Sequence, residues 1–235
     1  MHVLQVSWEF PPLTYGGLGR HVTALTESLA AQGVSVTVLT QRPAGTAEFE
    51  QHGPIAVHRV APPSESVPME PNALVEWTTS LDTSMAARGA QLCADLRPDV
   101  VHAHDWVVHQ TAIACAQTDV PLVATVHATE AGRHQGWVHS DISRLIHRAE
   151  FTLTRNADRV ITCSTAMRQE VHQLFDVPTD SIDVIPNGID LSEWTTTPSA
   201  VTAAKHRFAA DKRPLVLFVG RLEWEKGVHT LLEAA

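Results

Sequence analysis

The 235-residue sequence has few cysteines, no excess of basic residues and no long apolar run. Its three cysteines (Cys93, Cys115 and Cys163) lie far apart in apolar segments, which favours reduced core thiols over disulfides or metal ligands. A formal charge of −9 with scattered lysines and arginines argues against a nucleic-acid partner. Because no apolar run approaches about 20 residues and no basic leader precedes the first strand, we expect a cytoplasmic protein without a transmembrane segment.

Short apolar runs alternate with helical patterns along the chain. The runs predict strands at 2–7, 34–39, 55–60, 100–103, 122–126, 159–162, 182–185 and 215–219. Several are continuous Val, Ile and Leu runs, typical of strands covered on both faces of a parallel sheet. Helical periodicity predicts helices at 18–32, 73–96, 107–117, 142–157, 165–175 and 200–210. This alternation predicts an α/β fold with a Rossmann-like, doubly wound parallel sheet.

Turn residues mark a boundary late in the chain. The stretch "PNGIDLSEWTTTPS" is followed by a second series of helix, strand, polar loop and helix. We expect a first Rossmann-like domain over 1–187, an interdomain linker over 188–199 and the start of a second domain over 200–235. Because the chain stops inside a predicted helix of that second domain, we expect it to be a fragment of a longer protein.

Three glycines follow the first strand, in "SWEFPPLTYGGLGR". The missing side chains of Gly16, Gly17 and Gly19 would let backbone N–H groups and a helix N-terminus approach an anion, although a tight turn explains them equally well. As a dinucleotide fingerprint the stretch is poor, because Val22 stands where a third small residue belongs. Arg42, at the end of the second strand, keeps NADP binding open as an alternative.

Polar side chains end the fourth strand, in "VVHAHDW". In open α/β sheets, ligands bind beyond the carboxyl ends of the strands, so His102, His104 and Asp105 are candidates for a site. Three interpretations remain open: a metal pair completed by a distant third ligand, the polar lining of a cleft, or a histidine that packs beside the core.

Two further groups of polar residues follow strands. His127 ends the fifth strand in "TVHATEAGR", with Glu130 and Arg133 beyond it, and its imidazole either donates to a sugar hydroxyl or developing charge or caps the strand. In "VGRLEWEKG", Arg221 and Lys226 precede a helix, where two cations suit a diphosphate, although a solvated charge run explains them too.

Five stretches in this order resemble the retaining glycosyltransferases of family 4 and their glycogen-synthase-like relatives. They are "SWEFPP…YGGLGRHV", "HAHDW", "TVHATEAGR", "VIPNGIDLSEW" and "VGRLEWEKG", and they span essentially the whole chain. The first, together with "HATEAGRHQGW", is most similar to the α-1,4-glucosyltransferases of methylglucose lipopolysaccharide and α-glucan assembly. The resemblance implies the GT-B fold of two facing Rossmann domains, of which this chain supplies the N-terminal, acceptor-binding one.

The resemblance also implies an activity and its site residues. A glucosyl or other hexosyl unit would pass from a nucleotide sugar, UDP- or ADP-glucose, to a glucan or other glycan acceptor with retention of configuration, without a metal or other cofactor. His127 would be catalytic, near the transferring sugar. The donor diphosphate would meet Gly16, Gly17, Gly19, Arg221 and Lys226. The sugar and acceptor cleft would be lined by His104, Asp105, Glu130, Arg133 and Asn187.

Two departures from the family pattern affect these expectations. Thr14 stands where glycogen synthases often carry a lysine that contacts phosphate. The paired glutamates and the base pocket of the family fall beyond residue 235, so we expect the chain to be inactive alone. An NADP-dependent oxidoreductase domain and a non-catalytic sugar-binding module are the alternative functions.

Overall fold

The structure, a computed structural model, describes residues 1–68, 70–209, 215–220 and 222–234. The chain divides into two compact units, Met1–Pro186 and Asn187–Ala235, and each is described by itself. The domain and linker boundaries expected at 187 and 199 stay predictions.

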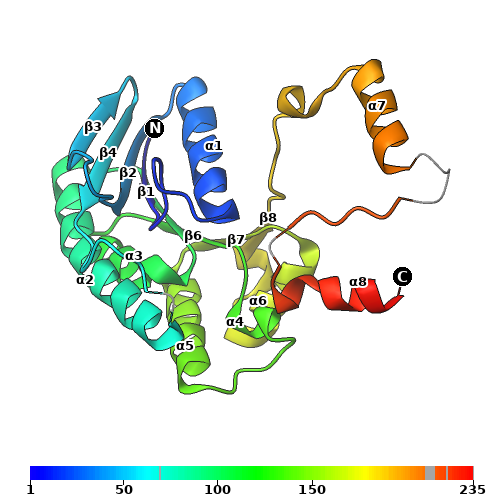
Figure 1. Ribbon diagram of the computed structural model, residues 1–235. Helices are drawn as coiled ribbons and strands as arrows, with labels where there is room; N and C mark the ends of the chain where they lie inside the picture. The colour runs from blue at the N-terminus through cyan, green and yellow to red at the C-terminus, as the bar shows by residue number, and fades with distance from the viewer. Residues whose placement is uncertain (69, 210–214, 221, 235) are drawn as a thin grey trace. The chain divides into compact units, whose positions relative to one another are not determined.

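The first unit is built on one eight-stranded sheet (Figure 1). Its strands are β1 (His2–Val6), β2 (Ser35–Gln41), β3 (Phe49–His52), β4 (Ile55–Val60), β5 (Val100–His104), β6 (Leu122–Val126), β7 (Arg159–Thr162) and β8 (Ile182–Val184). Their order in space is β3-β4-β2-β1-β5-β6-β7-β8, and only the pair β3 and β4 is antiparallel. From β1 the chain winds toward one edge and from β5 toward the other, so the predicted doubly wound Rossmann-like sheet is confirmed.

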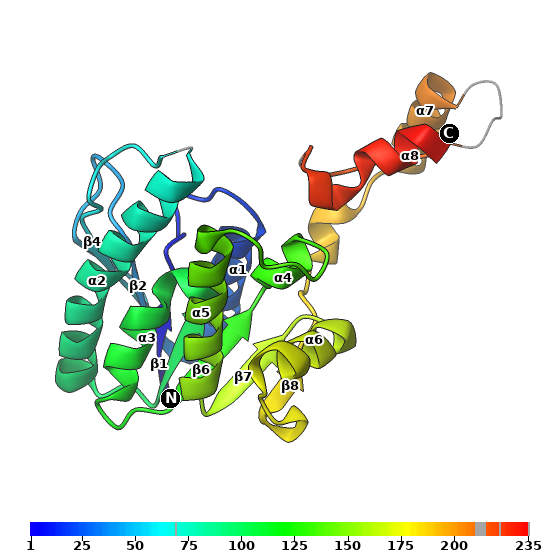
Figure 2. The same ribbon diagram turned by 90° about the horizontal axis from the view of Figure 1, so that it is seen from below.

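Helices cover both faces of this sheet. In the first unit they are α1 (Gly17–Ala31), α2 (Pro71–Leu96), α3 (His109–Ala116), α4 (Glu130–Arg133), α5 (Asp141–Asn156) and α6 (Thr165–Phe175). Helix α1 lies on one face, and α2, α3 and α5 lie together on the other (Figures 1 and 2). This two-sided cover explains why the strands carry continuous apolar runs.

The two faces of the sheet have separate apolar cores. On the side of α2, the core includes Leu4 and Val6 of β1 with Leu81 and Met85 of α2, all fully buried or nearly so. Under α1, a smaller core of buried residues contains Val22, Val36, Val38 and Val57, joined by Phe10. Each fully buried aliphatic side chain stabilises the fold by about 1.5–3 kcal/mol relative to exposure.

Helix ends follow local sequence signals. Gly33 lies directly after the C-cap of α1 with φ of +81°, and its N–H donates to the Ala30 carbonyl at 3.0 Å, a position that favours glycine. At the start of α5, the hydroxyl of Ser140 accepts the N–H of Ser143 at 3.0 Å. The two caps satisfy backbone groups at these helix ends that have no partner within the helix.

Strand β3 was not predicted from the sequence. Its residues, Phe-Glu-Gln-His, lack the apolar alternation of a strand, and it pairs antiparallel with β4 at the edge of the sheet. The two strands are joined through Gly53, whose φ is +58°, and Pro54. The turn rather than hydrophobicity therefore sets this hairpin.

The second unit differs from its expected strand pattern. Its described elements are the short turns Leu191–Trp194 and Trp224–Lys226 and the helices α7 (Pro198–Phe208) and α8 (Val228–Ala234). The predicted strand at 215–219 is wrong as a description of this structure: residues 215–219 form no strand, and Leu217 is 77% exposed. A strand forms by pairing, and the described residues of this unit include no other strand to pair with.

No helix in the described parts of the chain has the length and apolar character needed to cross a membrane.

Candidate active site

The candidate site lies at the carboxyl edge of the sheet, around its switch point. Strands β1 and β5 are neighbours there, and the connections after them leave in opposite directions. Doubly wound sheets bind their ligands in the crevice at such a point. Here β1 leads to the glycine-containing loop and α1, β5 leads to Asp105, and β6 leads to His127.

The glycine-containing loop is held by a carboxylate of the chain itself. One oxygen of Glu9, a residue only 5% exposed, accepts the backbone N–H groups of Tyr15 at 2.8 Å and Gly16 at 3.1 Å. These two amides are therefore already occupied. The expected contact between the glycines and a donor diphosphate stays a prediction. Such a contact would have to be made by other backbone N–H groups of the loop and of α1.

The three glycines serve different purposes in this loop. A Cβ on Gly19 would lie 2.9 Å from the Glu9 carboxylate and 2.9 Å from the Thr14 methyl group, so only glycine fits there without a shift. A Cβ on Gly16 or Gly17 would have no described atom within 4 Å. Gly19 is thus required for packing, whereas Gly16 and Gly17 leave space beside the helix N-terminus.

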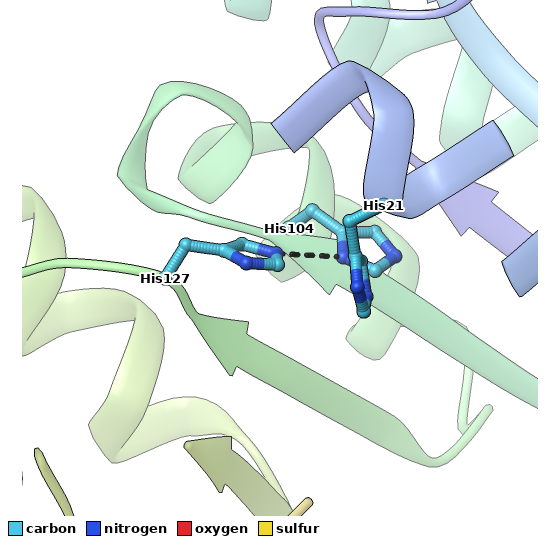
Figure 3. Close-up of side chains that lie close together, drawn as sticks. All are labelled: His21, His104 and His127. Atoms are coloured by element: carbon cyan, nitrogen blue, oxygen red, sulfur yellow. Dashed lines mark hydrogen bonds between the residues drawn. The ribbon is translucent and has the colours of Figure 1, made fainter. Parts of the chain in front are cut away.

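Three imidazoles from different elements meet at the switch point (Figure 3). His104 ends β5, His127 follows β6, and His21 lies on α1. The Nδ1 atom of His104 is 3.3 Å from the Nε2 atom of His127, and the His21 ring packs edge-on at 4.8 Å from the His127 ring centre. The structure therefore brings His104 and His127 together and adds His21, which the sequence analysis did not single out.

His102 lies behind this cluster. Its Nε2 is 2.7 Å from the hydroxyl of Thr125, and its ring centre is 4.2 Å from that of His104. Burial, together with the nearby rings of His21 and His127, lowers the pKa of His102 to about 3. His102 is thus a neutral support for His104 at neutral pH.

His104 is completely buried and neutral. Burial holds the pKa of His104 well below the usual histidine value, and the neighbouring imidazoles act in the same direction. Its Nδ1 atom faces His127, whereas its Nε2 atom has no hydrogen-bond partner among the described residues. The hydrogen bond to His127 therefore joins two ring nitrogens whose protons depend on the tautomers of both rings.

Asp105 adopts a strained backbone conformation next to this cluster. Its φ of +61° and ψ of 172° fall in a region used almost solely by glycine, at a cost of about 1–3 kcal/mol. Two hydrogen bonds hold it there: its N–H donates to the Thr125 carbonyl at 3.0 Å, and its carboxylate accepts the backbone N–H of His127 at 2.8 Å. Strain maintained by such contacts is typical of active sites, and here it fixes the position of His127.

Glu130 and Arg133 lie on the short helix α4, where a loop was expected. The Glu130 carboxylate is buried, accepts the hydroxyl of Ser143 at 2.6 Å and lies 3.1 Å from the His134 imidazole. Arg133 is exposed. Glu130 thus joins α4 to α5, and the cleft roles expected for both residues stay predictions.

The remaining predicted site residues belong to the second unit. Asn187 and Lys226 are exposed there, and Lys226 ends the turn Trp224–Lys226. Arg221 lies outside the described residues. The expected role of Asn187 in the sugar and acceptor cleft, and those of Arg221 and Lys226 toward the donor diphosphate, therefore stay predictions.

A hollow of about 510 Å³ lies away from the histidines, beyond the carboxyl ends of β2 and β4. Arg42 is among the residues that line it, and its guanidinium forms an ion pair with Glu48. We place the chemistry at the switch point instead, because the histidines and the strained aspartate converge there.

The fold and this edge define a Rossmann-like ligand-binding domain. Residues 15–193 match Glycosyltransferase Family 4, and the chain belongs to that family. Across the whole chain it is 42% identical to a protein named glycogen synthase from Mycobacterium tuberculosis, of which it covers 57%.

Two solved structures have a similar fold. Sucrose-phosphate synthase from Thermosynechococcus elongatus superposes with a TM-score of 0.74 at 22% identity, over 99% of this chain and 59% of that one. The catalytic domain of starch synthase IV from Arabidopsis thaliana, bound to ADP and acarbose, gives 0.66 at 18% identity over 99% and 65%. The chain thus spans little more than half the length of its relatives and has the fold of the N-terminal part of GT-B glycosyltransferases.

His21 is the site residue that the sequence analysis missed. Its signal was present, because His21 lies three residues after Leu18 and four before Leu25 on the apolar face of α1. The apolar residues of that face were recognised and the histidine among them was not.

Proposed function

We propose that this chain is the acceptor-binding, N-terminal part of a retaining glycosyltransferase. The enzyme transfers a glucosyl or other hexosyl unit from a nucleotide sugar, UDP- or ADP-glucose, to a glucan or other glycan acceptor. The observation that carries the proposal is His127, held by the strained Asp105 and by His104 at the switch point of a family 4 domain. The bound ADP of the starch synthase structure supports a nucleoside diphosphate as the leaving group.

In the proposed reaction, the bond between the anomeric carbon and the diphosphate oxygen breaks, and the acceptor oxygen bonds to the same carbon on the same face. The acceptor proton passes to the departing diphosphate. His127 donates a hydrogen bond to a hydroxyl group of the transferring sugar, and its fixed backbone keeps this contact in place. No metal is required as a cofactor in this proposal, because Arg221, Lys226 and backbone N–H groups stabilise the charge on the diphosphate.

The other partners follow from the same proposal. Asp105, Glu130, Arg133 and Asn187 contact the sugar or the acceptor, and Gly16 and Gly17 allow close approach of the diphosphate. A nucleotide sugar as donor is consistent with a cytoplasmic enzyme.

We expect Lys226→Ala to lower turnover by about 10²-fold, the scale for loss of a preorganised charge partner.

The test is a transfer assay on the longest natural protein that contains these 235 residues. UDP-glucose and ADP-glucose are supplied in turn with maltooligosaccharides, and the product linkage is read by NMR. We expect α-linked elongation from one or both donors, lowered about 10²-fold by His127→Ala but not by His139→Ala, a change at an exposed histidine.

Two results would overturn the proposal. Tight binding of NADPH, with no binding of either nucleotide sugar, would favour the oxidoreductase alternative. Binding of maltooligosaccharides without transfer from any nucleotide-glucose donor would favour a sugar-binding module.

A further inference from the structure

We propose that His21, His104 and His127 form a binding site for one transition-metal ion of the zinc type, and that the bound ion inhibits the enzyme. Their ligand nitrogens all lie within 4.8 Å of one another, and this is the one such group of three in the described residues. The three side chains come from α1, β5 and the loop after β6, and they converge as Figure 3 shows. The inhibition rests on the proposed function; the metal binding does not.

The spacing of two of the nitrogens already fits a metal. In tetrahedral zinc sites, Zn–N bonds of about 2.0–2.1 Å place neighbouring ligand nitrogens about 3.3–3.4 Å apart. His104 Nδ1 and His127 Nε2 are 3.3 Å apart. His21, which is half-buried on the first turns of α1, supplies the third ligand nitrogen, which lies within 4.8 Å of the other two.

The supporting contacts hold two of these ligands in place before any ion binds. The Asp105 carboxylate fixes the backbone of His127, and the His102 ring packs against the His104 ring while its own nitrogen is tied to Thr125. Contacts outside the ligand shell typically contribute a factor of about 10–100 in metal affinity. His104 and His127 are therefore the two ligands that supporting contacts hold in place.

The ligand types select the class of metal. Three imidazoles without a carboxylate suit Zn²⁺, Cu²⁺ or Ni²⁺, whereas Mg²⁺, Mn²⁺ and Ca²⁺ prefer oxygen ligands. The proposed ion thus belongs to a different class from these oxygen-preferring ions, and the proposed transfer reaction does not use it. It would occupy the His127 nitrogen that faces His104, and so hold that imidazole away from the sugar.

The first experiment measures binding alone. The untagged 235-residue chain is titrated with Co²⁺, whose visible absorption reports tetrahedral nitrogen ligation, and then with Zn²⁺ as competitor. We expect one ion per chain, with affinity lowered at least about 10-fold by His21→Ala. His52→Ala, at the exposed edge strand β3, is the matched control and should leave the affinity unchanged.

Several results would overturn the site. These are the absence of tetrahedral Co²⁺ absorption, equal affinities for wild type and His21→Ala, or equal losses for His21→Ala and His52→Ala. Thermal melting checks that each variant is folded, and His21→Gln replaces His21→Ala if the latter melts early.

The second experiment measures inhibition in the longest natural form of the protein. We expect micromolar Zn²⁺ to suppress glucosyl transfer, EDTA to restore it, and His21→Ala to need at least about 10-fold more Zn²⁺ for the same suppression. Binding without suppression would overturn the inhibitory role and leave the site. Absence of transfer in metal-free buffer would instead refute the proposed function.

Discussion

Asp82 and His104 are both completely buried polar side chains, yet their surroundings differ. The Asp82 carboxylate of α2 accepts three hydrogen bonds, from the backbone N–H of Gln110 and from the N–H and hydroxyl of Thr111, and the Nδ1 atom of His109 lies 3.3 Å from it. It thereby caps the N-terminus of α3 from a neighbouring helix. Burial raises the pKa of Asp82, and these hydrogen bonds oppose the rise.

His104, in contrast, has a hydrogen-bond partner among the described residues at only one of its two ring nitrogens. One ring nitrogen faces His127, and the other has no partner in the part of the chain that the structure describes. A buried group whose hydrogen bonds are all made within the fold stabilises it, whereas a buried nitrogen without a hydrogen-bond partner calls for an explanation other than stability. The comparison separates structural polar residues from functional ones, and the following variants test it.

Asp82→Ala is expected to have the largest effect, on stability. It leaves the buried N–H of Thr111 and the partly buried N–H of Gln110 without an acceptor at the start of α3, at a cost of about 1–3 kcal/mol each. Urea denaturation of the 235-residue chain measures the loss. Asp95→Ala, at an exposed position of the same helix, is the control and should change stability by less than about 0.5 kcal/mol. A loss below about 1 kcal/mol for Asp82→Ala would break the comparison.

His127→Ala is expected to act on catalysis rather than on folding. We expect a loss of about 10²-fold in transfer, equivalent to about 2.7 kcal/mol, because the sugar loses a positioned donor. Melting temperature and circular dichroism should stay close to wild type. An unfolded His127→Ala variant would show that His127 caps the strand and has a structural role, as Asp82 does.

Gly19→Ala and Gly17→Ala make a matched pair within one helix. The methyl group at Gly19 must displace the Glu9 carboxylate, which is held by two backbone N–H groups, so we expect a destabilisation of about 1–3 kcal/mol. Gly17→Ala meets open space and should leave the stability unchanged or slightly higher. If Gly17→Ala weakens nucleotide-sugar binding without loss of stability, the predicted approach of the diphosphate gains support. Equal stability of both variants would contradict the packing role of Gly19.

Glu150 shares features with both Asp82 and His104. One oxygen of its carboxylate accepts the Glu130 N–H at 2.7 Å, and the other has no hydrogen-bond partner within the described residues. Burial raises the pKa of Glu150, and the Asp105 and Glu130 carboxylates add to the rise. The hydrogen bond from the Glu130 N–H and the charge of Arg133 oppose it, and the resulting pKa is about 8. Because the folded state then binds the proton more tightly than the unfolded state, stability falls as pH rises between about 4.5 and 8.

Glu150→Gln should remove this dependence. From pH 6 to pH 7 we expect the wild type to lose about 1 kcal/mol relative to the variant, the smallest effect of the series. The amide oxygen of the variant still accepts the Glu130 N–H. Parallel stability curves for the two proteins over this interval would show that Glu150 is ionised in the fold.

The strand pattern of the first unit was predictable because buried parallel strands need apolar side chains on both faces. The runs at 55–60, 122–126 and 159–162 match β4, β6 and β7 residue for residue. Strand β3 escaped because an edge strand carries no such requirement, although the Gly-Pro turn before β4 signals a hairpin. The run at 215–219 was misjudged because hydrophobicity does not supply a pairing partner.

The site was predictable only in part. Strand ends located His104, Asp105 and His127, because a parallel sheet brings its carboxyl ends to one edge. The contact between His104 and His127 depends on the adjacency of β5 and β6, and the packing of His21 depends on how α1 lies on the sheet. The Glu9 contacts were also unforeseen, since nothing local marks a carboxylate that bonds six and seven residues ahead.

Glu9 gives the glycine-containing loop a property that its composition does not suggest. A chain segment with three glycines in four residues has a large conformational entropy when free. The carboxylate ties down the Tyr15 and Gly16 amides, and Gly19 locks the helix against the same side chain. The loop is therefore preorganised. If the proposed donor binds beside Gly16 and Gly17, the loop backbone is already ordered, and little binding free energy is spent on ordering it.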